Sequence, residues 1–228
     1  MAALGTSALH AAQNFPTKPV RLIAPYAAGG ASDRVARVVA QKFSDRYGQQ
    51  FVVDNRAGAG GIRGNIAPLA ISPAMQANLG FDPLKDFAPI SLLATGPTVL
   101  VVNPAIPAKS VKELIARAKA QPRKLNYGTG AICTALAPDL PTVAEAGLPG
   151  IASDTWWFLL APARTPAAVI NQLNAETRRV LLLPDVKERF ADLGIDGAAS
   201  SPAEFSAFLK AELEKFVKLI RVTVIRAE

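Results

Sequence analysis

The sequence predicts an α/β fold, and three features near its start carry that prediction. The apolar run Val20–Ala24 is typical of a buried strand. A helical spacing of apolar residues follows from Asp33 to Tyr47, and Gly48 marks its end. A second run, Phe51–Asp54, completes a βαβ unit, whose strands we expect to pair in parallel with a right-handed crossover.

The turn that joins the first strand to the helix, Pro25–Asp33, is the most informative stretch of the chain. The first amides of a helix have no partner within it and carry the positive end of its dipole. Because Gly29 and Gly30 let a ligand approach the backbone, the turn suits a carboxylate or a phosphate. Ser32 or Asp33 can cap the helix. A tight connection without a ligand fits the same residues.

The remaining elements follow from similar patterns. A second Gly-rich turn, Gly128-Thr129-Gly130, comes after a short strand, so two βα units each offer a loop suited to an anion. Apolar stripes on the helices, including Val111–Ala118, are interpreted as core. Strands are expected at 90–94, 99–102, 125–127 and 156–161, and helices at 110–121, 142–147, 165–180, 184–194 and 201–220.

Composition narrows the classes of function. The net charge of +7 favours anionic ligands, but the basic residues are scattered, so we do not expect nucleic-acid binding. Cys133 and His10 are the one cysteine and the one histidine. No Ser-His or Cys-His relay and no His/Cys metal site is therefore expected, and neither is a cofactor. No run of 18 apolar residues is present.

The first residues, Met1–Ala12, are small and apolar, and are interpreted as a truncated export signal, with a disordered start as the alternative. The Gly58–Gly64 loop superficially resembles a dinucleotide fingerprint, with Asp82 at about the distance of a ribose-binding acid. Arg63 stands where that fingerprint needs glycine, so an oxidoreductase is the weaker alternative.

Several segments, taken in order over almost the whole chain, resemble the substrate-binding proteins of tripartite tricarboxylate transporters, the Bordetella uptake gene family. The matching segments are Phe15–Ile23, Pro25–Asp33, Gly48–Val53, Asn55–Gly61, Asp82–Phe87, Asn126–Gly128, Leu140–Gly147 and Leu159–Ala163.

The resemblance implies a periplasmic-binding-protein-like fold with two lobes and mainly parallel sheets, which closes over a small carboxylate in the periplasm. It implies a monomer, transporter membrane subunits as partners, and no catalysis. Lobe one would comprise 14–100 and 155–228, and lobe two 101–154, after a start at 1–13. The ligand contacts that it implies, together with our reading of the cleft walls, are Tyr26, Ala28, Gly29, Gly30, Ala31, Ser32, Asp33, Gly128, Thr129, Gly130 and Trp157.

The chain also departs from the family pattern. After Ile66 the family continues with a helix, a strand and a ligand loop, whereas here the chain moves almost at once to Ile71. After Gly130 most of the second lobe is missing. Two interpretations stay open beside carboxylate capture: a degenerate member with little or no binding, and a chain whose second lobe is completed by a partner. Trp157 is either a cleft wall or core.

Overall fold

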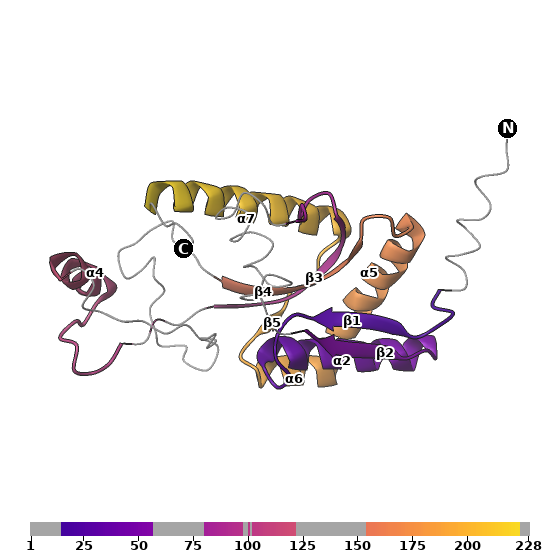
Figure 1. Cartoon of the computed structure of the whole chain (residues 1–228). Helices are drawn as coiled ribbons and strands as arrows, with labels where there is room; N and C mark the ends of the chain where they lie inside the picture. The colour runs from indigo at the N-terminus through magenta and orange to yellow at the C-terminus, as the bar shows by residue number, and fades with distance from the viewer. Residues whose placement is uncertain (1–14, 57–79, 98–99, 101, 122–153, 224–228) are drawn as a thin grey trace.

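The computed structural model describes residues 15–56, 80–97, 100, 102–121 and 154–223, and Figure 1 shows how their elements are arranged. The strands are β1 (Val20–Ala24), β2 (Phe51–Asn55), β3 (Phe87–Pro97), β4 (Asp154–Pro162) and β5 (Asp196–Gly197). The helices are α2 (Ala31–Tyr47), α4 (Val111–Ala120), α5 (Ala167–Leu181), α6 (Pro184–Ala191) and α7 (Pro202–Thr223).

The predicted βαβ unit is confirmed. β1 and β2 pair in parallel from Val20 opposite Phe51 to Ala24 opposite Asn55, and α2 connects them. Gly48 ends the helix in the left-handed conformation, at φ 64°, and its amide donates to the Ser44 carbonyl. The parallel register brings the carboxyl ends of both strands to the start of α2, where the Gly-rich turn lies.

The second sheet has the order β4-β3-β5, and both of its pairings are antiparallel. The expectation of mainly parallel sheets is therefore met by β1–β2 but not by this sheet. The cause is topological, because β4 returns beside β3 after a long excursion and runs back along it. The α/β class itself is confirmed, with helices covering both faces.

Alternating side chains on β3 and β4 divide the core between those two faces. Trp157 faces the larger cluster, with residues of α2, α5 and α6. Trp156 faces the smaller one, where Phe205, Leu209 and Phe216 of α7 cover it. Figure 1 shows α7 above the sheet and α2 with α6 below it.

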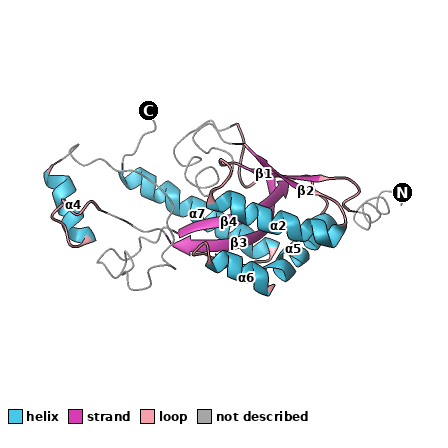
Figure 2. Cartoon of the chain, turned by 90° about the horizontal axis from the view of Figure 1, so that it is seen from below, coloured by secondary structure: helices cyan, strands magenta, loops and turns pink. Residues whose placement is uncertain are grey.

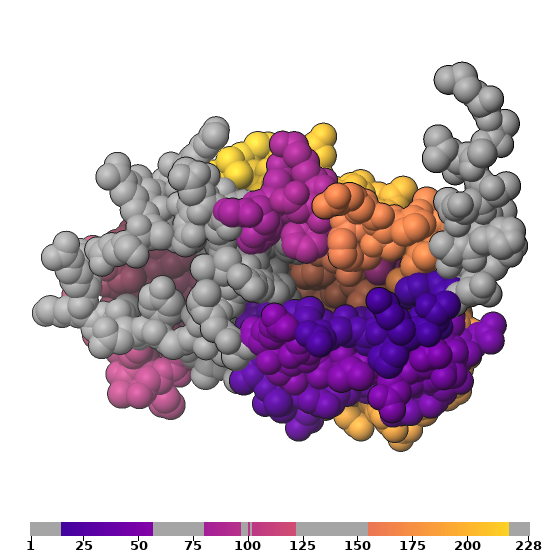
Figure 3. Space-filling model, turned by 45° about the vertical axis from the view of Figure 1, so that its right-hand side comes forward, coloured from indigo at the N-terminus to yellow at the C-terminus, as the bar shows by residue number. Residues whose placement is uncertain are grey.

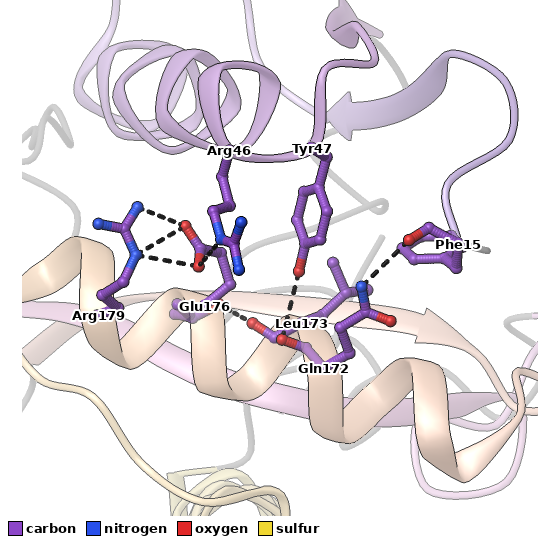
Figure 4. A network of polar contacts seen from close by, with 8 residues as sticks. Phe15, Arg46, Tyr47, Gln172, Leu173, Glu176 and Arg179 are labelled. Atoms are coloured by element: carbon purple, nitrogen blue, oxygen red, sulfur yellow. Dashed lines mark hydrogen bonds and ion pairs between the residues drawn. The ribbon is translucent and has the colours of Figure 1, made fainter. Parts of the chain in front are cut away.

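Polar contacts fasten the end of α2 to α5 (Figure 4). The buried Glu176 carboxylate accepts from Arg179, at 2.6 Å for the shortest contact, and lies 3.7 Å from the Arg46 guanidinium. The Tyr47 hydroxyl donates to the Gln172 carbonyl at 3.4 Å. These contacts fix the helix whose other end carries the Gly-rich turn.

α4 differs from the other helices because it buries no residue. The serine half of its predicted capping box is confirmed, with the Glu113 amide donating to Ser110 Oγ at 3.2 Å. The Glu113 carboxylate accepts instead from the amide of Lys109, one residue before the cap, at 2.8 Å. The apolar stripe of α4, however, is only half-buried at Leu114 and Ile115 and exposed at Ala118, so the interpretation as core is wrong here. Figures 1 and 2 both show α4 away from the other described helices.

Two further expectations about helix starts have different outcomes. The last helix begins as predicted, with Ser201 and Glu204 exchanging side-chain and amide bonds at 3.2 and 2.7 Å. At α5, Pro166 occupies the capping position instead of the first helical one, and Thr165 provides no side-chain cap. Within the described residues, no helix is long and apolar enough to cross a membrane.

Candidate functional site

The turn between β1 and α2 has the form that an anion site needs. Gly29 adopts φ +91°, which only glycine accommodates easily, and Gly30 is the N-cap of the helix without any side-chain cap. Residues Ala27–Gly30 are exposed. Within the described residues, no acceptor is found for the amides of Ala31, Ser32 and Asp33. They stand at the positive end of a 17-residue helix.

Asp33 occupies the centre of this turn but is not its cap. The side chain is buried, and its Oδ2 accepts from the Gly29 amide and from Arg37 Nε, each at 2.9 Å. Its Oδ1 accepts from Asn55 Nδ2 at 2.9 Å. The prediction that Ser32 or Asp33 caps the helix is therefore wrong. The carboxylate reaches back past the capping residue and fastens the loop before it.

This set of donors keeps Asp33 ionised. The hydrogen bond from Arg37 is the largest cause that lowers the pKa of Asp33 from 3.8 to about 2. The Gly29 and Asn55 bonds act in the same direction, while burial opposes them. One consequence limits the anion site, because the Gly29 amide is already engaged and only the later amides of the turn are open to a ligand.

Ser32 and Trp157 connect the turn to the second sheet. The Trp157 indole N–H donates to Ser32 Oγ at 3.1 Å, across 125 positions of sequence. The Trp157 side chain is 6% exposed and lies in the larger core cluster. Of the two roles considered for Trp157, the structure places it in the core. Its indole positions the serine hydroxyl, whose own proton stays available to an anion.

Tyr26 lies at the entrance of the turn and is half-buried. Burial raises the pKa of its phenol from 10.0 to about 12, so the group is a neutral donor at physiological pH. Its carbonyl accepts from Asn55 Nδ2 at 3.2 Å. Asn55 thus holds the loop at both Tyr26 and Asp33.

Two residues of this arrangement, Arg37 and Asn55, were not among the predicted site residues. Arg37 follows Asp33 by four positions on a helix, a spacing that brings opposite charges together. Asn55 ends β2, and a parallel pair places that end beside the end of β1. Both signals are present in the sequence and could have been used.

Other predicted positions do not add to the site. Gly128, Thr129 and Gly130, the Gly58–Gly64 loop and the first residues to 14 lie outside the described residues. Asp82, the acid of the dinucleotide alternative, contacts neighbouring residues of its own turn. Its carboxylate accepts from the Leu84 amide at 2.9 Å and pairs with Lys85 at 2.8 Å.

Two hollows of similar size lie on the described part of the surface, and residues 26–32 line neither of them. One, of about 300 Å³, lies between α6 and β5. The other, of about 290 Å³, lies between α2 and α6. In Figure 3 the indigo and purple residues of β1, α2 and β2 form the lower part of the face shown. The start of the turn, residues 27–30, is exposed.

Comparison with known proteins decides the family. The model of the tripartite tricarboxylate transporter family receptor matches residues 35–137 and 133–224. The chain belongs to this family. The two matched stretches overlap at residues 133–137. This overlap lies next to the junction after Gly130, where the sequence predicts a shortened second lobe.

Curated relatives share sequence along most of the chain. A UPF0065 protein from the tcbD-tcbE intergenic region of Pseudomonas sp. strain P51 is 28% identical over 290 aligned positions, which include 90% of this chain and 86% of the relative. Protein BugT of Bordetella pertussis is 25% identical over 308 positions, with 98% of this chain and 94% of BugT covered. Both alignments exceed the 228 residues of this receptor-family chain, so the relatives contain segments with no counterpart here.

Solved structures show the fold. An R. palustris protein solved with adipate has a TM-score of 0.81 at 24% identity, covering 93% of this chain and 99% of its own. MatC from Rhodopseudomonas palustris, with bound malate, has a TM-score of 0.78 at 23% identity, and the match covers 90% of this chain and 100% of MatC. The periplasmic binding protein BugD has a TM-score of 0.76 at 23% identity, and the match covers 94% of this chain and 100% of BugD. The periplasmic-binding-protein-like fold is thereby confirmed for this member of the receptor family.

Proposed function

We propose that this receptor-family chain captures a small carboxylate in the periplasm, hands it to the membrane subunits of a tripartite tricarboxylate-type transporter, and catalyses no reaction on it. The observation that carries the proposal is the row of amides at Ala31–Asp33, behind Gly29 and Gly30, for which the described residues offer no acceptor. The relatives of known structure that hold adipate and malate support the ligand class.

The chemistry of the turn fits one carboxylate group. Its oxygens would accept from the Ala31 and Ser32 amides and from the Ser32 hydroxyl, and such charge-assisted bonds each contribute about 1.5–3 kcal/mol. The buried Asp33 charge would oppose an anion nearby, but Arg37 at 2.9 Å offsets it. The Gly128-Thr129-Gly130 loop is proposed as the donor to the other end of the ligand.

A thermal-shift experiment tests the proposal. Adipate, malate and citrate at matched ionic strength should raise the melting temperature, because a ligand that binds only the folded state stabilises it, by about 2.7 kcal/mol at a hundred times its Kd. NAD serves as the comparison ligand. A shift with NAD alone would support an oxidoreductase instead and would refute capture.

One observation favours a second candidate, a family member with little or no binding. The Gly29 amide is already engaged by Asp33, and residues 27–30 are exposed. A cleft needs two walls to bury a ligand. If the protein melts cooperatively but no carboxylate shifts its melting temperature at millimolar concentration, this second candidate replaces the first.

A further inference from the structure

A hollow of about 290 Å³ between α2 and α6 is lined by an excess of positive charge. Its lining residues are Arg34, Arg37, Val38, Arg189, Asp192 and Leu193. Three arginines from two helices therefore line one depression, together with a single acidic residue. Carboxylate capture at the β1–α2 turn makes no use of Arg34 or Arg189.

The two helices that line the hollow are joined by one ion pair and share a core cluster. Lys42 of α2 pairs with Asp185 of α6 at 2.6 Å. Beneath them, Val35 and Val38 of α2 share a core cluster with Val186 and Phe190 of α6.

Of the charged residues that line the hollow, Arg37 forms an ion pair within the described part of the chain, and Arg189 acts electrostatically on Asp185. Among the described residues, no ion pair within 4.0 Å involves Arg34, Arg189 or Asp192. Arg37 donates one bond to Asp33 and another to Asn55, yet its side chain remains 55% exposed. Guanidinium groups bind carboxylates in a forked, two-bond geometry, so several in one hollow favour a partner that carries several carboxylates.

We infer that this arginine-lined hollow is a docking surface for an acidic segment of a protein partner. The inference rests on the proposed function for the nature of that partner, a transporter subunit that meets the carboxylate-loaded receptor. A protein segment is favoured over a free metabolite because the arginine side chains are exposed and the hollow is open, whereas small ligands are usually enclosed.

The test measures binding of a fluorescently labelled hexaglutamate peptide by anisotropy at low salt. The double variant Arg34→Glu/Arg189→Glu should weaken binding roughly tenfold or more. The matched control is Arg164→Glu/Arg178→Glu, which changes the net charge equally at two exposed arginines outside the hollow. The control should bind like the unaltered protein, and affinity should fall as salt rises.

Three results would overturn the inference. The first is that the unaltered protein does not bind the peptide, and the second is that the two double variants lose affinity equally. The third is that free citrate displaces the peptide at an equal carboxylate concentration. The last result would mean a small-anion site. Circular dichroism melts establish that both variants fold. The carboxylate thermal shift, measured on the same variants, should be unchanged, so failure of docking and failure of capture are separate outcomes.

Discussion

A single buried carboxylate, Asp33, organises the candidate site. It accepts from the Gly29 amide before the helix, from Arg37 one turn later and from Asn55 on the neighbouring strand. Removing one partner of a buried, charged set leaves the others unsatisfied. The shape of the turn therefore depends on Asp33.

The lowered pKa of Asp33 makes stability depend on pH. Its pKa is about 2 in the folded protein and near 3.8 when unperturbed, so its stabilising contribution is complete above about pH 5 and is lost as the pH falls through 3.8 and then 2. Asp33→Asn should cost about 2 kcal/mol at pH 7 and flatten the stability curve between pH 4 and 2. Urea unfolding across that range measures both. An unchanged slope in the variant would show that other carboxylates cause it.

Gly29 and Gly30 offer a matched pair of substitutions. Gly29→Ala places a side chain at φ +91° and should cost about 1–2 kcal/mol of stability. At Gly30 the backbone is ordinary, and an added Cβ would meet only the Ala27 carbonyl oxygen at 3.9 Å. Gly30→Ala should fold normally but lose most of the carboxylate-induced thermal shift. A full shift in Gly30→Ala would place the ligand elsewhere.

At the scale of elements, local patterns predicted much of the secondary structure. The side-chain cap at Ser110 and the capping box at Ser201 were predictable because each depends on residues three positions apart. The β1–α2–β2 unit was predictable because its elements follow one another directly in the sequence. The antiparallel partner of β3 was not, since the pairing of β4 with it is set by contacts about seventy positions away. The burial of Trp157 against Ser32 has the same non-local origin.

The contrast between α7 and α4 gives a prediction about packing. Leu209 of α7 is 1% exposed in the Trp156 cluster, whereas Leu114 of α4 is only half-buried, on a helix that buries nothing. Leu209→Ala should cost about 2–5 kcal/mol through lost burial and a cavity. Leu114→Ala, the same chemical change, should stay within about 0.5 kcal/mol. Equal costs, measured by urea unfolding, would mean that α4 is packed in solution.

At the scale of the whole molecule, the family and its fold could be predicted because the matching segments occur in the family's order along almost the whole chain. The division into two lobes stays a prediction. The shortened length also follows from the sequence, and alignments of 290 and 308 positions against a chain of 228 residues agree with it. What the shortening does to ligand binding depends on side chains opposite the turn, which local patterns do not fix.

Native-state hydrogen exchange can test how unevenly stability is distributed over the molecule. Amides of β3 and α5 lie in the larger core cluster, so they should exchange only by global unfolding. α4 has ten residues and no buried side chain, and an isolated helix of that length is marginal in water. Its amides should therefore exchange within about tenfold of an unstructured peptide. Protection of α4 equal to that of α5 would show that a further element covers α4. Repeating the measurement with the carboxylate ligand would then reveal whether this covering element also closes over the β1–α2 turn.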